Sequence, residues 1–315
     1  MKKRFPQLIC FIYVLFVAAN ISMAGEKYLT SHQPITNFLN TVHDKFSYSL
    51  VSFADRLDYF LSKENVDEEN NATRAYLSIG IKTDKENDVV FLSDTRVRLV
   101  LPGLENRLHV IFDDAFENDD PDEISSIIQS AEKSTPSAGL RYILLKGLRE
   151  RIQTDIGIRR GNPVQFFGRA RGKIIFPIGQ WELRFYQTIM WLTEDRWEET
   201  TEMRWDFSLP DNYLFRSETR LKWEEMKNGT TPSHSFILYK EINPRSVWDI
   251  DLSGKWPQTP HTDEAEYVVS VTYRRLIYSK WLFLDISPGI SFAQIYNYNE
   301  NPFIILKLEF AFGNL

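Results

Sequence analysis

The sequence predicts a transmembrane antiparallel β-barrel of about 14 strands, with 12 as the alternative count. Three observations predict this fold: an export signal at the N-terminus, a two-residue alternation of apolar and polar side chains along most of the chain, and an aromatic final strand. In residues 304–312, large apolar side chains occupy every second position. A period of two indicates a β-strand with one apolar face.

The first 24 residues have the features of a secretory signal peptide. Lys2, Lys3 and Arg4 supply the positive start, and residues 8–19 form an uncharged apolar core. Residues 22–24 read Ser-Met-Ala, in which Ser and Ala are the small residues at positions −3 and −1 of a cleavage site. The apolar core is shorter than the roughly 20 residues that a spanning helix needs. We therefore predict a cleaved signal peptide over 1–24 rather than a membrane anchor.

Composition narrows the class of the exported chain. The single cysteine, Cys10, lies inside the predicted signal peptide, so disulfides, thiol catalysis and cysteine metal sites are excluded from the predicted mature chain. Loss of the three N-terminal cations takes the net charge from −6 to −9, which argues against nucleic acid as a partner. The 22 Phe, 14 Tyr and 8 Trp suit a barrel with aromatic girdles.

Residues 25–71 are predicted to form an amphipathic helix followed by a polar linker. Apolar side chains recur at spacings of three and four over 34–62, and Pro34 suits a first helical turn. This helix could cap the end of the barrel, fill its lumen as a plug, or lie on the inner leaflet of the outer membrane. The barrel itself is predicted over 72–315.

Strands and connections alternate regularly from residue 72 onward. We predict strands over the following ranges: 73–83, 89–101, 106–114, 138–147, 151–159, 163–175, 180–192, 197–209, 213–225, 233–242, 246–256, 264–275, 280–291 and 302–313. Short turns rich in Pro, Gly and Asn alternate with connections that are generally longer or more polar, of which 115–137 is the longest. Short periplasmic turns and longer external loops are the outer-membrane arrangement.

The middle strands separate an apolar face from a charged face. Phe207 and Leu252 belong to the apolar face, which must meet lipid, whereas Ser208 and Ser253 belong to the face that points into the lumen. A soluble sandwich would reverse these roles. The gathering of Trp and Tyr near strand ends, and an arginine-rich polar face, favour the membrane barrel.

The candidate functional residues are a cluster of charges on the lumen face: Arg169, Arg171, Lys173, Glu182, Arg184, Glu202, Arg204, Asp206, Arg216, Glu218, Arg220 and Lys222. The basic row at 169–173 could select anions in an open pore. Alternatively, each cation pairs with a carboxylate of the neighbouring strand and the lumen is shut.

The turn at 210–212 predicts a register. If the hairpin folds symmetrically about Asp211, the directly opposed pairs are of opposite sign, and Phe207 opposes Phe215 on the lipid face. The three predicted charge pairs are Asp206 with Arg216, Arg204 with Glu218, and Glu202 with Arg220.

No catalytic constellation is visible, so we expect no catalytic, cofactor-binding or metal-binding residues. His109 is predicted to point into the lumen as a hydrogen-bonded side chain. His234 stands between Ser233 and Ser235, and residues adjacent in a strand point to opposite faces, so these neighbours cannot form a dyad. The sequence also lacks a glycine-rich phosphate loop and a His/Asp/Glu set at metal-ligand spacing.

Four segments resemble a family of uncharacterised proteobacterial outer-membrane β-barrel proteins. The segments are 56–61 (RLDYFL), 101–109 (LPGLENRLH), 281–288 (WLFLDISP) and 306–313 (LKLEFAFG). The resemblance implies the barrel fold and the outer-membrane location. It implies no reaction.

The functional expectation is a non-catalytic outer-membrane barrel in a Gram-negative bacterium, serving as an envelope structural component or as a narrow pore with a charge-lined lumen. The alternative is an outer-membrane lipid-modifying enzyme of the phospholipase or lipid A deacylase type. The expected partners are outer-membrane lipid and, during biogenesis, the barrel assembly machinery. The sequence does not identify a solute.

Overall fold

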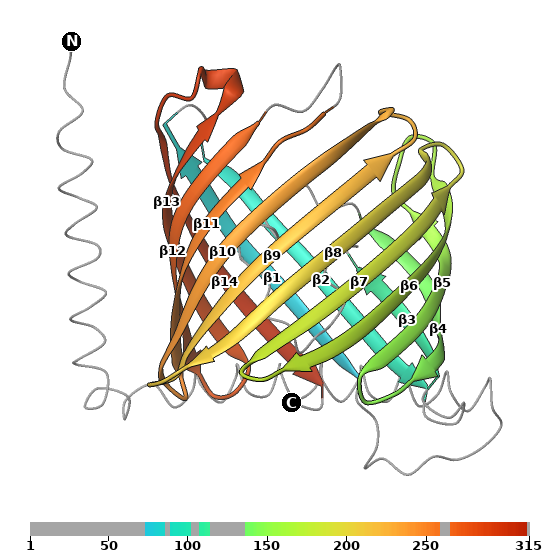
Figure 1. Ribbon diagram of the computed structural model, residues 1–315, viewed down its shortest axis with the longest axis horizontal. Coiled ribbons are helices and arrows are strands. Elements are labelled where there is room, and N and C mark those ends of the chain that lie inside the picture. Colours follow the sequence, from blue (N-terminus) through green and yellow to red (C-terminus); the bar gives the residue numbers. More distant parts are fainter. Residues whose placement is uncertain (1–72, 86–88, 102–106, 114–135, 259–264, 314–315) are drawn as a thin grey trace, which may run out of the picture. The chain divides into compact units, whose positions relative to one another are not determined.

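The computed structural model describes residues 73–85, 89–101, 107–113, 136–258 and 265–313. Their fold is a closed barrel of 14 strands, as predicted, and not the alternative of 12 (Figure 1). The strands are β1 (Arg74–Asp84), β2 (Val90–Leu101), β3 (Leu108–Asp113), β4 (Ser137–Lys146), β5 (Glu150–Arg159), β6 (Gln165–Ile178), β7 (Trp181–Leu192), β8 (Arg196–Leu209), β9 (Tyr213–Glu224), β10 (Gly229–Asn243), β11 (Ser246–Lys255), β12 (Glu266–Tyr278), β13 (Leu282–Ala293) and β14 (Asn301–Gly313). A short 3₁₀ helix, η4 (Gln294–Tyr296), follows β13.

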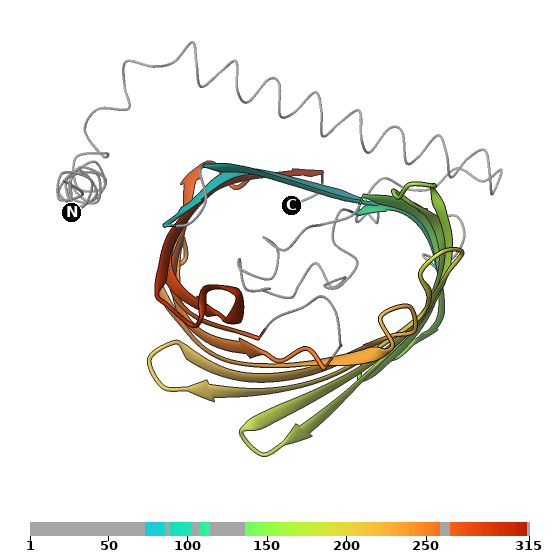
Figure 2. The ribbon, with the colours of Figure 1, turned by 90° about the horizontal axis from the view of Figure 1, so that it is seen from above.

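Every strand is antiparallel to its neighbours in chain order, and the first strand pairs with the last. The β1–β14 pairing runs without interruption from Arg74 opposite Gly313 to Asp84 opposite Phe303. Seen along the barrel, the strands form a ring around a lumen (Figure 2). Closure removes the unpaired edges that an open sheet would expose. Within the described part of the chain, no helix is long and apolar enough to cross a membrane.

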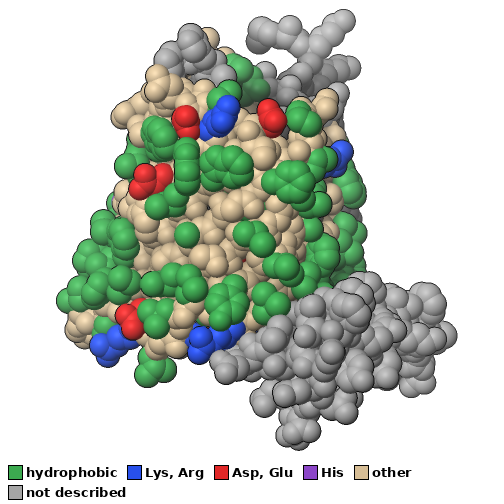
Figure 3. All heavy atoms as spheres, turned by 90° about the vertical axis from the view of Figure 1, so that its right-hand side faces the viewer, with side chains coloured by type: hydrophobic (Ala, Val, Ile, Leu, Met, Phe, Trp, Pro, Cys, Tyr) green, Lys and Arg blue, Asp and Glu red, His purple; other side chains and the backbone are tan. Residues whose placement is uncertain are grey.

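The two-residue alternation decides which side chains point outward. On β14, Glu309 is 3% exposed and hydrogen-bonded inside the barrel, whereas its neighbours Leu308 and Phe310 belong to the opposite face. On β11, Asp251 is 1% exposed and Leu252 is 47% exposed. Hydrophobic side chains spread over the outer wall in Figure 3, with charged groups gathered towards its two ends. Apolar residues therefore face outward where lipid would lie, as the sequence predicts.

The β8–β9 hairpin has the predicted register. Asp211 and Asn212 adopt left-handed φ angles of 59° and 60°, which lets a three-residue turn reverse the chain between Leu209 and Tyr213. Asn and Asp tolerate this backbone region better than most residues. Phe207 lies directly opposite Phe215, and all three predicted charge pairs are in register.

Several predictions fall outside the described residues. The signal peptide over 1–24 and the helix with its linker over 25–71 remain predictions, as does most of the loop at 115–137.

Candidate functional site: the charged lumen

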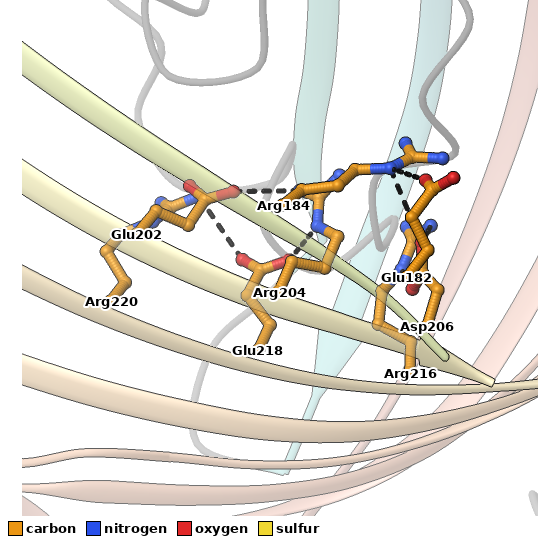
Figure 4. Close-up of polar contacts among 8 residues, drawn as sticks. All are labelled: Glu182, Arg184, Glu202, Arg204, Asp206, Arg216, Glu218 and Arg220. Atoms are coloured by element: carbon orange, nitrogen blue, oxygen red, sulfur yellow. Dashed lines mark hydrogen bonds and ion pairs between the residues drawn. The ribbon is translucent and has the colours of Figure 1, made fainter. Parts of the chain in front are cut away.

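The lumen face of β7, β8 and β9 carries a ladder of alternating charges (Figure 4). Arg216 donates from Nε and Nη2 to the two carboxylate oxygens of Asp206, at 2.6 and 3.0 Å. Arg204 Nε donates to Glu218 Oε2 at 3.0 Å, and Arg220 Nη2 donates to Glu202 Oε2 at 3.1 Å. These are the three pairs that the hairpin register predicts.

Diagonal contacts join the pairs into one network. Arg204 Nη2 also donates to Glu202 Oε1 at 2.9 Å, so a single guanidinium bridges carboxylates of two strands. Arg184 of β7 stands in register with Arg204, which would be a repulsive pair. Its Nε instead contacts Glu182 Oε1 at 2.5 Å and Asp206 Oδ2 at 3.8 Å. The diagonal arrangement thereby relieves the like-charge register.

Burial makes this network sensitive to the loss of one member. The Arg204 side chain is 2% exposed, and the side chains of its partners Glu202 and Glu218 are 4% and 5% exposed. A buried ion pair adds little net stability, because desolvation offsets its attraction, but removal of one partner leaves a buried charge at a cost of about 3–5 kcal/mol. Lys222 continues the ladder towards the end of β9, with Nζ 3.6 Å from Glu198 and 3.4 Å from Glu224.

A second cluster lies on β4, β5 and β6 around Asp155. Arg141 donates from Nε and Nη2 to the two oxygens of Asp155, at 2.9 and 3.1 Å. Arg169 Nε donates to Asp155 Oδ2 at 2.7 Å. One buried carboxylate therefore holds guanidinium groups from the strands on both of its sides.

The other two residues of the basic row at 169–173 lie close to an aromatic ring. The Arg171 guanidinium lies 5.0 Å and Lys173 Nζ 5.4 Å from the ring centroid of Tyr186, which is itself 2% exposed. Arg204 approaches the same ring at 5.5 Å. The cross-strand register places Arg171 between Gln153 and Thr188. Of this row, the cross-strand register pairs Arg169 alone with a carboxylate.

Lumen charges are distributed unevenly around the barrel. The lumen face of β4–β6 holds at least six cations and one carboxylate; the cations are Arg141, Arg151, Arg159, Arg169, Arg171 and Lys173. The lumen face of β11–β13 holds four carboxylates and two cations: Asp249, Asp251, Glu266 and Asp285 with Lys255 and Arg274. β5 and β12 are seven strands apart in either direction around the closed ring. A basic wall thus faces an acidic wall across the lumen.

A third cluster joins the first strands of the barrel to the last. Glu309 of β14 accepts from Arg96 Nη2 at 3.0 Å and from Ser78 Oγ at 3.2 Å, and it also contacts Arg274 Nη2. Arg274 reaches Asp285 at 3.3 Å. Sequence patterns do not show this cluster, because closure of the barrel is what brings β1 and β2 beside β12, β13 and β14.

The described histidines occupy different faces. His109 points into the lumen, as predicted, is 1% exposed and accepts a hydrogen bond at Nδ1 from Arg98 Nε at 3.2 Å. His234 lies on the outer wall, where its Nδ1 is 2.8 Å from Thr219 Oγ1 and its Nε2 is 3.5 Å from Ser217 Oγ. These are cross-strand neighbours of β9 and β10, which only the register of the two strands could reveal.

Apolar side chains also occupy some positions of the lumen face, which is otherwise mostly polar. Phe167, Met190 and Leu192 form a buried cluster on the lumen positions of β6 and β7. A second cluster joins Val268, Phe303 and Ile305. Among the described residues, no group of three or more His, Cys, Asp or Glu side chains could hold a metal ion.

No family model matches the chain, and no curated protein matches it. Among solved structures, the barrel is similar to the outer membrane channel DcaP of Acinetobacter baumannii, with 6% identity, TM-score 0.46 and coverage of 77% of this chain and 97% of that one. It is also similar to an anion-selective porin from Comamonas acidovorans (8% identity, TM-score 0.44, 77% and 99% covered) and to OmpT, an outer membrane protein of Vibrio cholerae, in a form lacking loop L8 (7%, 0.46, 77% and 99%).

The location follows from the barrel itself. A closed antiparallel ring with an apolar outer wall and a charged interior satisfies the backbone inside a bilayer and buries its charges away from lipid. Single-chain barrels of this kind, with an even number of strands, belong to bacterial outer membranes. The protein is therefore an outer-membrane β-barrel.

Proposed function

We propose that this protein is a narrow passive pore for small hydrophilic solutes, with a preference for anions along the β4–β6 wall. The observation that carries the proposal is the basic wall of β4–β6 facing the acidic wall of β11–β13. A barrel filled only for stability would be expected to neutralise its charges locally. Opposed walls instead create a field across the lumen, which orients dipolar solutes and gives anions a separate path.

Barrel size supports a pore of limited width. Interiors of eight-stranded barrels are just filled by side chains, whereas barrels of about 16–18 strands enclose an aqueous channel. Fourteen strands lie between these cases. The β7–β9 ladder and the buried cluster of Phe167, Met190 and Leu192 occupy part of the cross-section on one side.

The second candidate function is an envelope structural component without conductance. The charge ladder of β7–β9 supports it, because paired charges such as Arg216 with Asp206 fill and stiffen an interior without offering a solute path. A lipid-modifying enzyme has less support. His234 and Ser217 do lie near each other on the lipid-facing wall, but the backbone amides of β9 and β10 there are engaged in ladder pairing on both sides. These strands then offer no free N–H groups to stabilise an oxyanion.

Planar-bilayer recording tests the proposal. The purified mature protein is expected to give discrete conductance steps, and a salt gradient is expected to give a reversal potential of the sign set by anion preference. The double variant Arg171→Gln/Lys173→Gln should shift the reversal potential towards cations. The matched variant Asp249→Asn/Asp251→Asn on the opposite wall should shift it the other way.

Two results would decide against a pore. A protein that inserts and shows heat-modifiable mobility, but gives no conductance steps, would favour the structural component. Shifts of the reversal potential in the same direction for both double variants would contradict the two-wall arrangement. Recording with and without residues 25–64 additionally tests the predicted N-terminal helix as a plug, since removal of a plug raises conductance.

A further inference from the structure

The lipid-facing wall of β7–β10 carries an unusual band of polar side chains. Their positions alternate with lumen residues such as Tyr186, Glu202 and Glu218, so they point outward. We call this set the polar band; it consists of Gln187, Glu199, Thr201, Ser217, Thr219 and His234. Outward positions on β13 and β14, by contrast, are largely Ile, Leu and Phe.

Hydrogen bonds divide the polar band into two groups. In the first group, Thr201 Oγ1 donates to Gln187 Oε1 at 2.8 Å, and Gln187 Nε2 donates to Glu199 Oε1 at 2.8 Å. In the second group, His234 lies between Thr219 and Ser217. These contacts use one of the roughly four acceptor positions that a carboxylate such as Glu199 offers. The polar band keeps unused capacity on its outward side.

Most of the polar band lies deeper in the bilayer than Trp223, whereas Glu199, which pairs with Trp223, lies only about 3 Å deeper than it. Trp223 and Tyr213 stand ten residues apart on β9. At a rise of about 3.4 Å per residue and a tilt of about 40°, they differ in depth by about 26 Å. That separation matches the apolar band of an outer-membrane barrel, roughly 25 Å tall. Thr219 lies four residues inward from Trp223, about 10 Å deeper by the same geometry. Hydrocarbon at that depth supplies no hydrogen bonds.

The residues of the polar band are spaced nearly evenly to either side of its centre. In Figure 1, these strands lean so that β10 lies above β8 at any given position along the wall. Glu199 pairs with Trp223, and Thr219 pairs with His234. With strands about 4.8 Å apart and the same rise and tilt, Glu199 and His234 differ in depth by about 4 Å and lie about 16 Å apart along the wall. Their midpoint falls on the exposed side chain of Leu221.

We infer that the polar band is the face through which two copies of this chain form a two-fold dimer in the membrane. A two-fold axis along the membrane normal, passing in front of Leu221, sets Glu199 of one copy opposite His234 of the other. It also brings Thr201 opposite Thr219 and Gln187 opposite Ser217. Each of these contacts joins a donor to an acceptor, as an isologous interface requires. This dimer would form whether or not the lumen conducts.

Other occupants fit the polar band less well. It contains no Lys or Arg, and its one formal charge is the carboxylate of Glu199, so it does not suit an anionic phosphate headgroup. Acyl chains cannot satisfy its hydrogen-bonding groups. A second copy supplies the complementary side chains at the right depth and adds apolar contact through Met203, which is 37% exposed, and Phe236, which is 46% exposed.

Disulfide crosslinking tests the axis, because the only cysteine lies in the predicted signal peptide. Leu221→Cys should join to its own copy on mild oxidation in intact outer membranes and yield a covalent dimer. The matched control is Ile79→Cys, an exposed outward position on β1, which should remain monomeric. Equal crosslinking at both positions, or none at Leu221→Cys, would overturn the proposal.

A charge exchange tests the paired residues. In lipid nanodiscs, light scattering should give the mass of a dimer for the unaltered protein. Glu199→His and His234→Glu should each lower the association constant by at least about tenfold, because each sets like groups against each other. The double variant Glu199→His/His234→Glu should restore it. A monomeric unaltered protein, or a double variant no better than the singles, would show that another molecule covers the polar band.

Discussion

Two walls of the lumen follow the same two-residue alternation but use it differently. On β8 and β9, successive lumen residues change sign, so that Glu202, Arg204 and Asp206 meet Arg220, Glu218 and Arg216. On β6, three successive lumen residues, Arg169, Arg171 and Lys173, are cationic, and of these only Arg169 has a carboxylate directly opposite. Charges that alternate in sign along a strand fix the register and neutralise that part of the lumen wall. Charges of one sign instead leave an electrostatic field that acts on solutes.

The largest expected effect on stability distinguishes the charge ladder of β7–β9 from the basic row at 169–173. Arg204→Ala should lower the free energy of unfolding by about 3–5 kcal/mol, because Glu202 and Glu218 lose their shared guanidinium while staying buried. Lys173→Ala should cost less than about 1 kcal/mol, because Lys173 is only partly buried. Urea unfolding in lipid vesicles measures both values. Similar losses for the two variants would remove the distinction between the walls.

The next effect contrasts the inside with the outside of one strand. Leu252→Arg should lower the free energy of unfolding by up to about 2–4 kcal/mol, because Leu252 faces lipid, with a smaller loss if it lies near an interface. Ser253→Arg, one residue along and on the lumen side, should be much milder. The fraction of heat-modifiable barrel on unheated gels compares them. The faces are wrongly assigned if both variants lose folded barrel equally.

A smaller effect on stability tests the contribution of the Tyr186 ring to the basic wall. Tyr186→Leu should lower the free energy of unfolding by about 1–2 kcal/mol, because Arg171, Lys173 and Arg204 all lie within cation–π distance of its ring. Tyr186→Phe keeps the ring and should change little. The same urea titration provides the comparison. If Phe and Leu behaved alike, the ring face would not hold these cations.

The smallest perturbation tests the ladder register directly. Phe207→Cys with Phe215→Cys should crosslink readily, since these positions are directly opposed on the outer wall. Phe207→Cys with Ser217→Cys is a diagonal pair on the same wall and should crosslink more slowly. Gel mobility with and without reductant reports the rates. The reverse order would mean a register shifted by two residues, with like charges opposed in the lumen.

Local patterns were sufficient to predict the strands and the β8–β9 hairpin. Alternation fixes which residues face lipid, and the turn at Asp211 and Asn212 fixes the register, so each inference needs only neighbouring residues. All 14 predicted strands are present, with ends that differ by a few residues. The largest difference is β10, which begins at Gly229 instead of residue 233.

The clusters that span several strands could not be predicted in this way. To predict that Asp155 binds both Arg141 and Arg169, one must know the β4–β5 register and the β5–β6 register together. Phe167, Met190 and Leu192 have the parity of lumen residues, but their packing on one another depends on the β6–β7 register. The contact between Ser217 and His234 depends on the β9–β10 register, which the sequence around residue 228 does not set by symmetry alone.

Glu309 lies at the seam where the barrel closes, and this position has a consequence for assembly. Its partners Ser78 and Arg96 are 231 and 213 residues away in sequence, and β1 pairs along its whole length with β14. Closing a flexible loop of this length costs about 5 kcal/mol beyond a constant. This free energy must be spent before the hydrogen bonds of the seam form, so the contacts of Glu309 with Ser78 and Arg96 should appear last. A chain that stalls before β14 docks would keep β1 open and available to pair with other strands.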